Sequence, residues 1–231
     1  MSHQVAIRAE GLTKSLGKHG VLRGVDLTII AGECVTLRGD NGAGKTTLLR
    51  CLAGLARPDA GHVCWFGRSP TETATHRLVG MVAHESHLHP HLTLRENLVL
   101  AGRLQDIAGP IPRADRWLEA AGLDNHADRL PKEVSQGMRR RASIARALLH
   151  EPMILLLDEP FSGLDQAGRA WLVDLLQEGH EQGRTTCLVT HEAPSKRQVS
   201  DRVLELRSGR LWGSPGASFA EPRARHEEVM A

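Results

Sequence analysis

One glycine-rich segment constrains this chain more than any other feature of its sequence. Its residues are Gly39, Asp40, Asn41, Gly42, Ala43, Gly44, Lys45, Thr46 and Thr47. The apolar run 34–38 before it predicts a buried strand, and 45–55 after it predicts a helix that ends ahead of Pro58. Glycines between a strand and a helix let backbone N–H groups turn toward a phosphate, and the helix start adds its positive dipole end. The segment therefore predicts a phosphate-binding loop, and a chance glycine-rich turn is the alternative.

The residues that follow have the chemistry needed to hold a nucleoside triphosphate with Mg²⁺. Lys45 is expected to neutralise the β- and γ-phosphates, and the hydroxyl of Thr46 is expected to ligate Mg²⁺. Further along, the apolar run 154–157 ends in Asp158 and Glu159. Ligands bind at the carboxyl ends of parallel strands, so we expect Asp158 to hold the Mg²⁺ shell and Glu159 to polarise the attacking water. Taken alone, this acidic pair is equally typical of turn residues that cap a strand.

The order of the expected elements predicts an α/β fold. Alternating apolar residues at 5–7 and 21–30 indicate antiparallel strands. The continuous apolar runs 153–157 and 185–190 are typical of central parallel strands, and 93–147 has a helical pattern interrupted by prolines. We therefore predict a P-loop NTPase core with a mainly parallel sheet, an N-terminal antiparallel β subdomain and an inserted helical subdomain.

The chain is expected to hold one copy of this domain, because no internal repeat is visible. We place the ATP-binding domain at 1–213, with the helical subdomain inserted at about 85–147. The segment 214–231 is polar, contains Pro215 and Pro222, and is expected to be a disordered tail.

Three further motifs, in order, resemble the ATP-binding subunits of ABC transporters. The run Val134-Ser135-Gln136-Gly137-Met138 resembles the signature of that family, Phe161 to Asp165 resembles its D-loop, and His191 resembles its switch histidine. The resemblance covers about 5–212. It implies an ATPase that uses ATP and Mg²⁺, with Lys45, Glu159 and His191 in catalysis.

The resemblance also implies a partner, a second copy of the chain facing head to tail in an ATP-sandwich dimer. Ser135, Gln136 and Gly137 of one copy would then contact ATP held by the other copy. A serine hydroxyl at a helix N-terminus is a ready anion site, which agrees with this role. Asp165 would link the two sites, and His191 would contact the γ-phosphate.

The chain departs from the family pattern at three places. Leu16 stands where most members place an aromatic residue that stacks on adenine, and the chain contains no tyrosine. We therefore expect weak base discrimination, with GTP competing against ATP. His84 replaces the Q-loop glutamine, which leaves a nucleotide or ion contact that can depend on pH. In the signature, Gln136 and Met138 replace the commonest residues.

Two clusters of charged or titratable residues have alternative interpretations. The segment 84–91 contains four histidines and is expected to be a polar loop that touches a membrane partner, with transition-metal or haem binding as the alternative. The arginines at 139–141 are interpreted as a solvated helical face and not as a nucleic-acid patch. The net charge of +2 is too small to argue for a nucleic-acid partner by itself, and we expect none.

The cysteines and the apolar runs indicate in which cellular compartment the chain works and whether it crosses a membrane. Cys34, Cys51, Cys64 and Cys187 have no paired metal-ligand spacing and are expected to be buried thiols in a reducing compartment. No apolar run approaches the roughly 20 residues of a membrane span. We therefore expect a peripheral subunit on the cytoplasmic face of the inner or plasma membrane, with an integral permease as its partner.

Within the family, the histidine at position 84 and the stretch from Val134 to Arg141 resemble the ATP-binding subunit of the haem exporter of cytochrome c biogenesis. This resemblance implies export of haem through a separate membrane subunit. Exporters of drugs, lipids or ions share most of the same residues and are the first alternative. A non-transport ABC ATPase is the second alternative, and a nucleotide-binding module without turnover is the third.

Overall fold

The computed structural model describes residues 4–190 and 200–213, which form two sheets with helices around them. The antiparallel sheet has the order β2-β1-β4. Its strands are β1 (Val5–Leu16), β2 (His19–Ile30) and β4 (Ala60–Trp65). Register shifts interrupt the β1–β2 pairing at several points, so this sheet is irregular.

The second sheet has six strands in the order β5-β6-β7-β3-β8-β9. Its strands are β3 (Cys34–Arg38), β5 (Val79–Val82), β6 (Ile154–Asp158), β7 (Thr185–Val189), β8 (Arg202–Arg207) and β9 (Arg210–Gly213). The first five strands of that order pair in parallel, and β9 joins the edge antiparallel to β8. The carboxyl ends of the parallel strands therefore meet along one edge, where ligands bind in such sheets.

Burial on both faces explains why the central strands are continuously apolar. Ile154 and Leu156 of β6 pack into a cluster with α1 (Lys45–Leu52) and the antiparallel sheet. Leu155 and Leu157 point the other way, into a cluster with α4 (Gln136–Leu148) and α5 (Gln166–Glu181). Successive side chains of a strand face opposite sides, so a strand covered on both sides needs apolar residues at every position.

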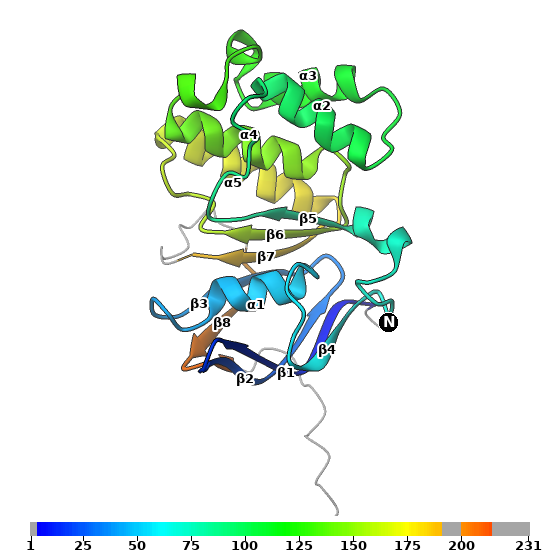
Figure 1. Cartoon of the computed structure of the whole chain (residues 1–231), viewed down its shortest axis with the longest axis vertical. Helices are drawn as coiled ribbons and strands as arrows, with labels where there is room; N and C mark the ends of the chain where they lie inside the picture. The colour runs from blue at the N-terminus through cyan, green and yellow to red at the C-terminus, as the bar shows by residue number, and fades with distance from the viewer. Residues whose placement is uncertain (1–3, 191–199, 214–231) are drawn as a thin grey trace, which may run out of the picture.

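A helical layer is inserted between β5 and β6 and lies at the far end of the molecule from the antiparallel sheet (Figure 1). It contains α2 (Leu94–Leu104), α3 (Pro110–Ala120) and α4, which share a cluster of buried side chains. Thr93 and Glu96 form a reciprocal capping box at the start of α2. Short 3₁₀ helices occupy Thr73–Leu78, Asp124–His126 and Pro131–Glu133.

The predicted fold class is confirmed, with local differences. The helix expected over 45–55 ends at Leu52, because Gly54 takes a left-handed φ of 72° and Leu55 is 70% exposed. Cys64 was expected to be buried but is only partly so, because β4 is an edge strand of its sheet. Across 4–190 and 200–213, no helix combines the length and apolar character that crossing a bilayer demands.

Candidate active site

The glycine-rich loop joins the end of β3 to the start of α1, and two of its glycines are required by geometry. A Cβ on Gly39 would lie 2.2 Å from the carbonyl oxygen of Leu206, and its φ is 148°. Gly44 caps α1 with a φ of 104°, a conformation that side chains rarely adopt. The loop can therefore turn tightly at the helix N-terminus, where backbone N–H groups and the helix dipole favour an anion.

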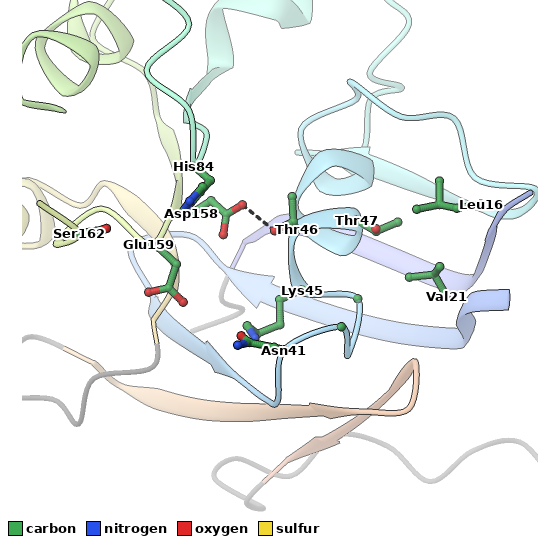
Figure 2. Close-up of a pocket in the computed structure, with 12 residues that line it drawn as sticks. Leu16, Val21, Asn41, Lys45, Thr46, Thr47, His84, Asp158, Glu159 and Ser162 are labelled. Carbon is green, nitrogen blue, oxygen red and sulfur yellow. Dashed lines mark hydrogen bonds between the residues drawn. The ribbon is translucent and has the colours of Figure 1, made fainter. Parts of the chain in front are cut away.

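Lys45 is the first residue of α1, and its side chain is 7% exposed. Its Nζ donates to the carbonyl oxygens of Gly39, at 2.7 Å, and Asp40, at 3.0 Å. These bonds fix the ammonium inside the curl of the loop, beside Asn41 (Figure 2). The loop thus presents a fixed positive charge to any group that enters from the cavity.

Thr46 and Asp158 bring the loop and the end of β6 together. The Thr46 Oγ1 donates to the Asp158 Oδ2 at 2.8 Å, although the two residues are 112 positions apart (Figure 2). Asp158 is 1% exposed, and its carboxylate lies at the carboxyl end of a central parallel strand. One hydroxyl and one carboxylate side by side fit Mg²⁺, which takes one or two protein oxygens and fills its other positions with water and phosphate.

Glu159 follows directly and has a left-handed backbone, with a φ of 48°. Non-glycine residues held in this region cost on the order of 1–3 kcal/mol and are found at functional sites. The backbone N–H of Glu159 donates to the carbonyl oxygen of Val189 at 2.9 Å, so the turn is tied to β7. The side chain is half-buried at the cavity, on the same side as Asp158 and His84 (Figure 2).

A cavity of about 600 Å³ opens over these groups. Its lining residues are Leu16, Val21, Asn41, Gly42, Gly44, Lys45, Thr46, Thr47, His84, Asp158, Glu159 and Ser162. Leu16 and Val21 form an aliphatic end, opposite the end occupied by His84 and Glu159 (Figure 2). These lining residues include no Phe, Tyr or Trp, in agreement with the missing stacking residue.

The predicted signature residues lie elsewhere on the surface. Ser135 caps α4, its Oγ accepting from the N–H of Met138 at 3.2 Å, and both Ser135 and Gln136 are exposed. A Cβ on Gly137 would lie 2.8 Å from the carbonyl oxygen of Gly163, so the predicted signature and D-loop of one chain touch. None of the three signature residues lines the large cavity.

A second cavity, of about 340 Å³, is lined by residues of both regions, among them His84 and Gln136. Asp165 caps α5, with its Oδ1 accepting from the N–H of Gly168 at 2.8 Å. His191 lies outside the described residues. The structure therefore brings the loop, Asp158, Glu159 and His84 together, and it leaves Ser135, Gln136 and Gly137 outside the cavity that these residues line.

The interpretation of 139–141 as a solvated face is wrong for Arg140. This side chain is 5% exposed and its guanidinium donates to four backbone carbonyl oxygens. Arg139 also bonds backbone, at Pro131 and Val134. Helical periodicity turns adjacent residues to different sides, so three successive arginines cannot share one solvated face.

The histidine-rich loop is held by its neighbours rather than by metal-ligand geometry. The backbone N–H of His89 donates to the Oδ1 of Asn97 at 2.6 Å, and the amide of this buried asparagine donates back to the carbonyl of His89. In the described part of the chain, no group of three or more His, Cys, Asp or Glu residues has metal-site geometry.

Comparison with known proteins decides the family. A family model described as ABC transporter matches residues 22–162. The chain belongs to the ABC transporter family. It is an ATPase domain of this family, and ATP and Mg²⁺ are its nucleotide and metal.

Relatives with different transport names share the domain. The chain is 36% identical to a sulfate/thiosulfate import ATP-binding protein of Synechococcus elongatus, over 94% of this chain and 65% of the relative. It is 39% identical to the Nod factor export ATP-binding protein I of Burkholderia lata, over 85% of this chain and 66% of the relative. It is 35% identical to an arginine transport ATP-binding protein of Bacillus subtilis, over 96% of this chain and 97% of the relative. The chain thus spans about two thirds of the length of the first two of these relatives.

A solved structure is similar throughout the domain. It is a dimeric ATP-binding cassette in a post-hydrolysis state bound to ADP and Pi, with a TM-score of 0.82 and 28% identity. The match covers 91% of this chain and 100% of that chain.

Proposed function

We propose that this chain is the ATP-hydrolysing subunit of an ABC transporter, and that two copies form an ATP-sandwich dimer that drives a separate integral membrane permease. One observation carries the proposal: the glycine-rich loop and the end of β6 meet at a single cavity, with Thr46 and Asp158 joined by a 2.8 Å hydrogen bond. This places a phosphate cradle and two carboxylates around one volume.

The side chains around this cavity have separate tasks in the proposal. Lys45 and the loop N–H groups bind the phosphates, and Thr46 and Asp158 hold Mg²⁺, which when bound neutralises charge on the phosphate oxygens. Glu159, which lies on the same side of the cavity as Asp158 and His84 (Figure 2), orients and polarises the attacking water. His84 contacts the water or the ion, and His191 is assigned to the γ-phosphate by its resemblance to the switch histidine.

A second copy is needed because the signature does not face the nucleotide cavity of its own chain. Ser135 and Gln136 are exposed, and Ser135 caps a helix whose N-terminus is suited to an anion. Contact between Ser135, Gly137 and the nucleotide of a second copy would complete both sites. The dimeric assembly of the similar cassette supports this arrangement, and Asp165 would lie between the two sites.

The dimer and the chemistry are tested together with the variant Glu159→Gln. Its neutral amide keeps the shape of the carboxylate but cannot polarise water as well, so we expect ATP to bind and turnover to fall by about 10²- to 10⁴-fold. With ATP and Mg²⁺, light scattering should show a dimer. A chain that stays monomeric under these conditions, while saturated with ATP, would overturn the sandwich model.

Lys45→Ala is the matched control for nucleotide binding. Removing the ammonium should weaken ATP binding itself, because the loop loses its fixed positive charge. This variant should therefore show neither turnover nor an ATP-dependent dimer. Unchanged affinity for ATP, measured by titration calorimetry, would remove Lys45 from its assigned role.

We further propose export of haem for cytochrome c biogenesis, with the subunit peripheral on the cytoplasmic face of the membrane. The resemblance at His84 and at Val134 to Arg141 supports this narrower function. The three relatives named above carry names of import, transport or export, and none of these names mentions haem. Purification of the chain with its membrane partner tests the assignment. A permease for another substrate would refute haem export, and recovery with no membrane protein would favour a non-transport ATPase.

A further inference from the structure

Arg140 makes an unusual set of contacts from the fifth position of α4. Its Nη1 donates to the carbonyl oxygens of Ala83, at 2.5 Å, and His84, at 3.2 Å. Its Nη2 donates to those of Asp158, at 2.8 Å, and Glu159, at 2.5 Å. The four terminal N–H donors of the guanidinium thus match four carbonyls, at the ends of two neighbouring parallel strands, β5 and β6.

These contacts hold a charged side chain at 5% exposure without a carboxylate as its hydrogen-bond acceptor. Burial lowers the pKa of Arg140, an effect opposed by the nearby charges of Asp158 and Glu159. A buried charge is costly unless its donors are satisfied, and here carbonyl oxygens accept from the four terminal donors, whereas the buried Nε of Arg140 has no hydrogen-bond partner among the described residues. Because burying this charge costs free energy, we explain the arrangement by the main-chain segments that Arg140 holds in place and not by a gain in folding stability.

The ordered segments are those that carry the reactive side chains. Glu159 has a left-handed backbone, and such a conformation persists only where the surroundings determine it. Arg140 bonds the carbonyl of Glu159 and that of Asp158 before it, so it fixes both sides of the turn. It fixes the main chain of His84 in the same way, on the neighbouring strand.

We propose that Arg140 is a positioning residue for ATP hydrolysis, which holds the main chain of Glu159 and His84 at a fixed place relative to the signature helix. It does not touch the nucleotide in this scheme. Ser135 caps the same helix. In the dimer, α4 would therefore connect the nucleotide that a second copy holds against Ser135 with the carboxylate of Glu159 in this chain. The inference rests on the proposed function and adds a residue to it.

The variant Arg140→Met tests the role, since its side chain has similar length but no donors. Steady-state hydrolysis should show kcat reduced by about 10²-fold, the size of effect expected when a catalytic group is displaced by about 1 Å. The dissociation constant for ATP should change less than about threefold, because Lys45 and the loop are untouched. Arg140→Lys, which keeps a charge and three donors, should recover part of kcat.

Arg141→Met is the matched control on the same helix. The Nη1 of Arg141 donates to the carbonyl of Ala121 at 2.7 Å, within the helical layer. This variant removes one hydrogen bond where Arg140→Met removes four, so it should lower the melting temperature less and leave kcat within about twofold of the wild type. If Arg140 only stabilised the fold, the loss of kcat would follow the loss of melting temperature in both variants. A loss of kcat in Arg140→Met beyond that relation shows the positioning role.

Wild-type turnover and the ATP-dependent dimer of Glu159→Gln are measured first. If the wild type does not hydrolyse ATP, or if Glu159→Gln does not dimerise, the proposed function itself is refuted. Given an active wild type, the assignment is overturned if Arg140→Met keeps wild-type kcat. It is also overturned if Arg140 and Arg141 variants lose activity in proportion to their melting temperatures. Should Arg140→Met not fold, Arg140→Lys decides: a kcat equal to the wild type refutes the role, and a reduced kcat with unchanged ATP affinity supports it.

Discussion

Replacing Leu16 with tyrosine should tighten nucleotide binding, because it supplies the stacking surface that the cavity lacks. Leu16 ends β1, is 57% exposed and forms the aliphatic end of the cavity with Val21. A substitution at so exposed a position should change the free energy of unfolding by no more than about 0.5 kcal/mol. Stacking of a base on an aromatic ring contributes about 1–3 kcal/mol, so the dissociation constant for ATP should fall by about 5- to 150-fold.

Calorimetric titration at fixed salt and Mg²⁺ measures this directly, with ATP, GTP and tripolyphosphate as ligands. The wild type should bind ATP and GTP with affinities within about fivefold of each other, since no aromatic face selects a base. Leu16→Ala, the control, should bind all three much as the wild type does. The reasoning fails if Leu16→Tyr binds tripolyphosphate, which has no base, more tightly by the same factor as ATP. A strong wild-type preference for ATP over GTP would refute it as well.

Two other predictions concern the fold. Trp65 is 2% exposed and its Nε1 donates to the carbonyl of Leu52 at 2.8 Å, so Trp65→Ala should cost about 3–5 kcal/mol in urea unfolding; a loss below about 1 kcal/mol would contradict the packing. Burial raises the pKa of the Cys34 and Cys187 thiols to about 12, so iodoacetamide at pH 8 should modify Cys64 first, as read by mass spectrometry. Modification of Cys187 in the native chain at the same rate as Cys64 would refute this.

Three strands of the parallel sheet, β3, β6 and β7, were predictable because each is a local apolar run. Residues 34–38 form β3 as expected, and the runs at 153–157 and 185–190 correspond to β6 and β7. The pairing order was not accessible in the same way. Neighbours in the sheet such as β3 and β8 are far apart in the chain, and their contact depends on packing that no local pattern encodes.

The main part of the candidate site was predictable from motif and strand ends together. The glycine-rich loop and the pair Asp158 and Glu159 each follow an apolar strand, and parallel strands end on the same edge. Their meeting at one cavity follows from that rule, although β7 separates β3 from β6 in the sheet. The left-handed backbone of Glu159 was not predictable, because glutamate has no preference for that conformation.

Arg140 was missed because its partners carry no signal in the sequence. Three successive arginines are typical of an exposed helix face, and the acceptors here are backbone carbonyls, which every residue has. The useful indication is the helix period. Ile144 and Ala147 of α4 pack against the sheet, and Arg140 lies one turn before Ile144 on the same side. An arginine on the apolar side of a helix requires a buried acceptor.

Close contacts join the signature helix to the D-loop and to the turn at Asp158 and Glu159, which we call the hydrolytic turn. These contacts limit which residues can occupy the three segments. A Cβ on Gly163 would lie 2.9 Å from the Cδ of Gln136, and one on Gly137 would lie 2.8 Å from the carbonyl oxygen of Gly163. The side chain of Gln136 therefore covers Gly163, whose φ of 74° already favours glycine. Because Arg140 ties the same helix to Glu159, a shift of the D-loop would press on the signature and reach the hydrolytic turn through one rigid helix. Position 163 therefore favours glycine through its left-handed backbone, whereas the exposed side chain of Gln136 is free to move aside.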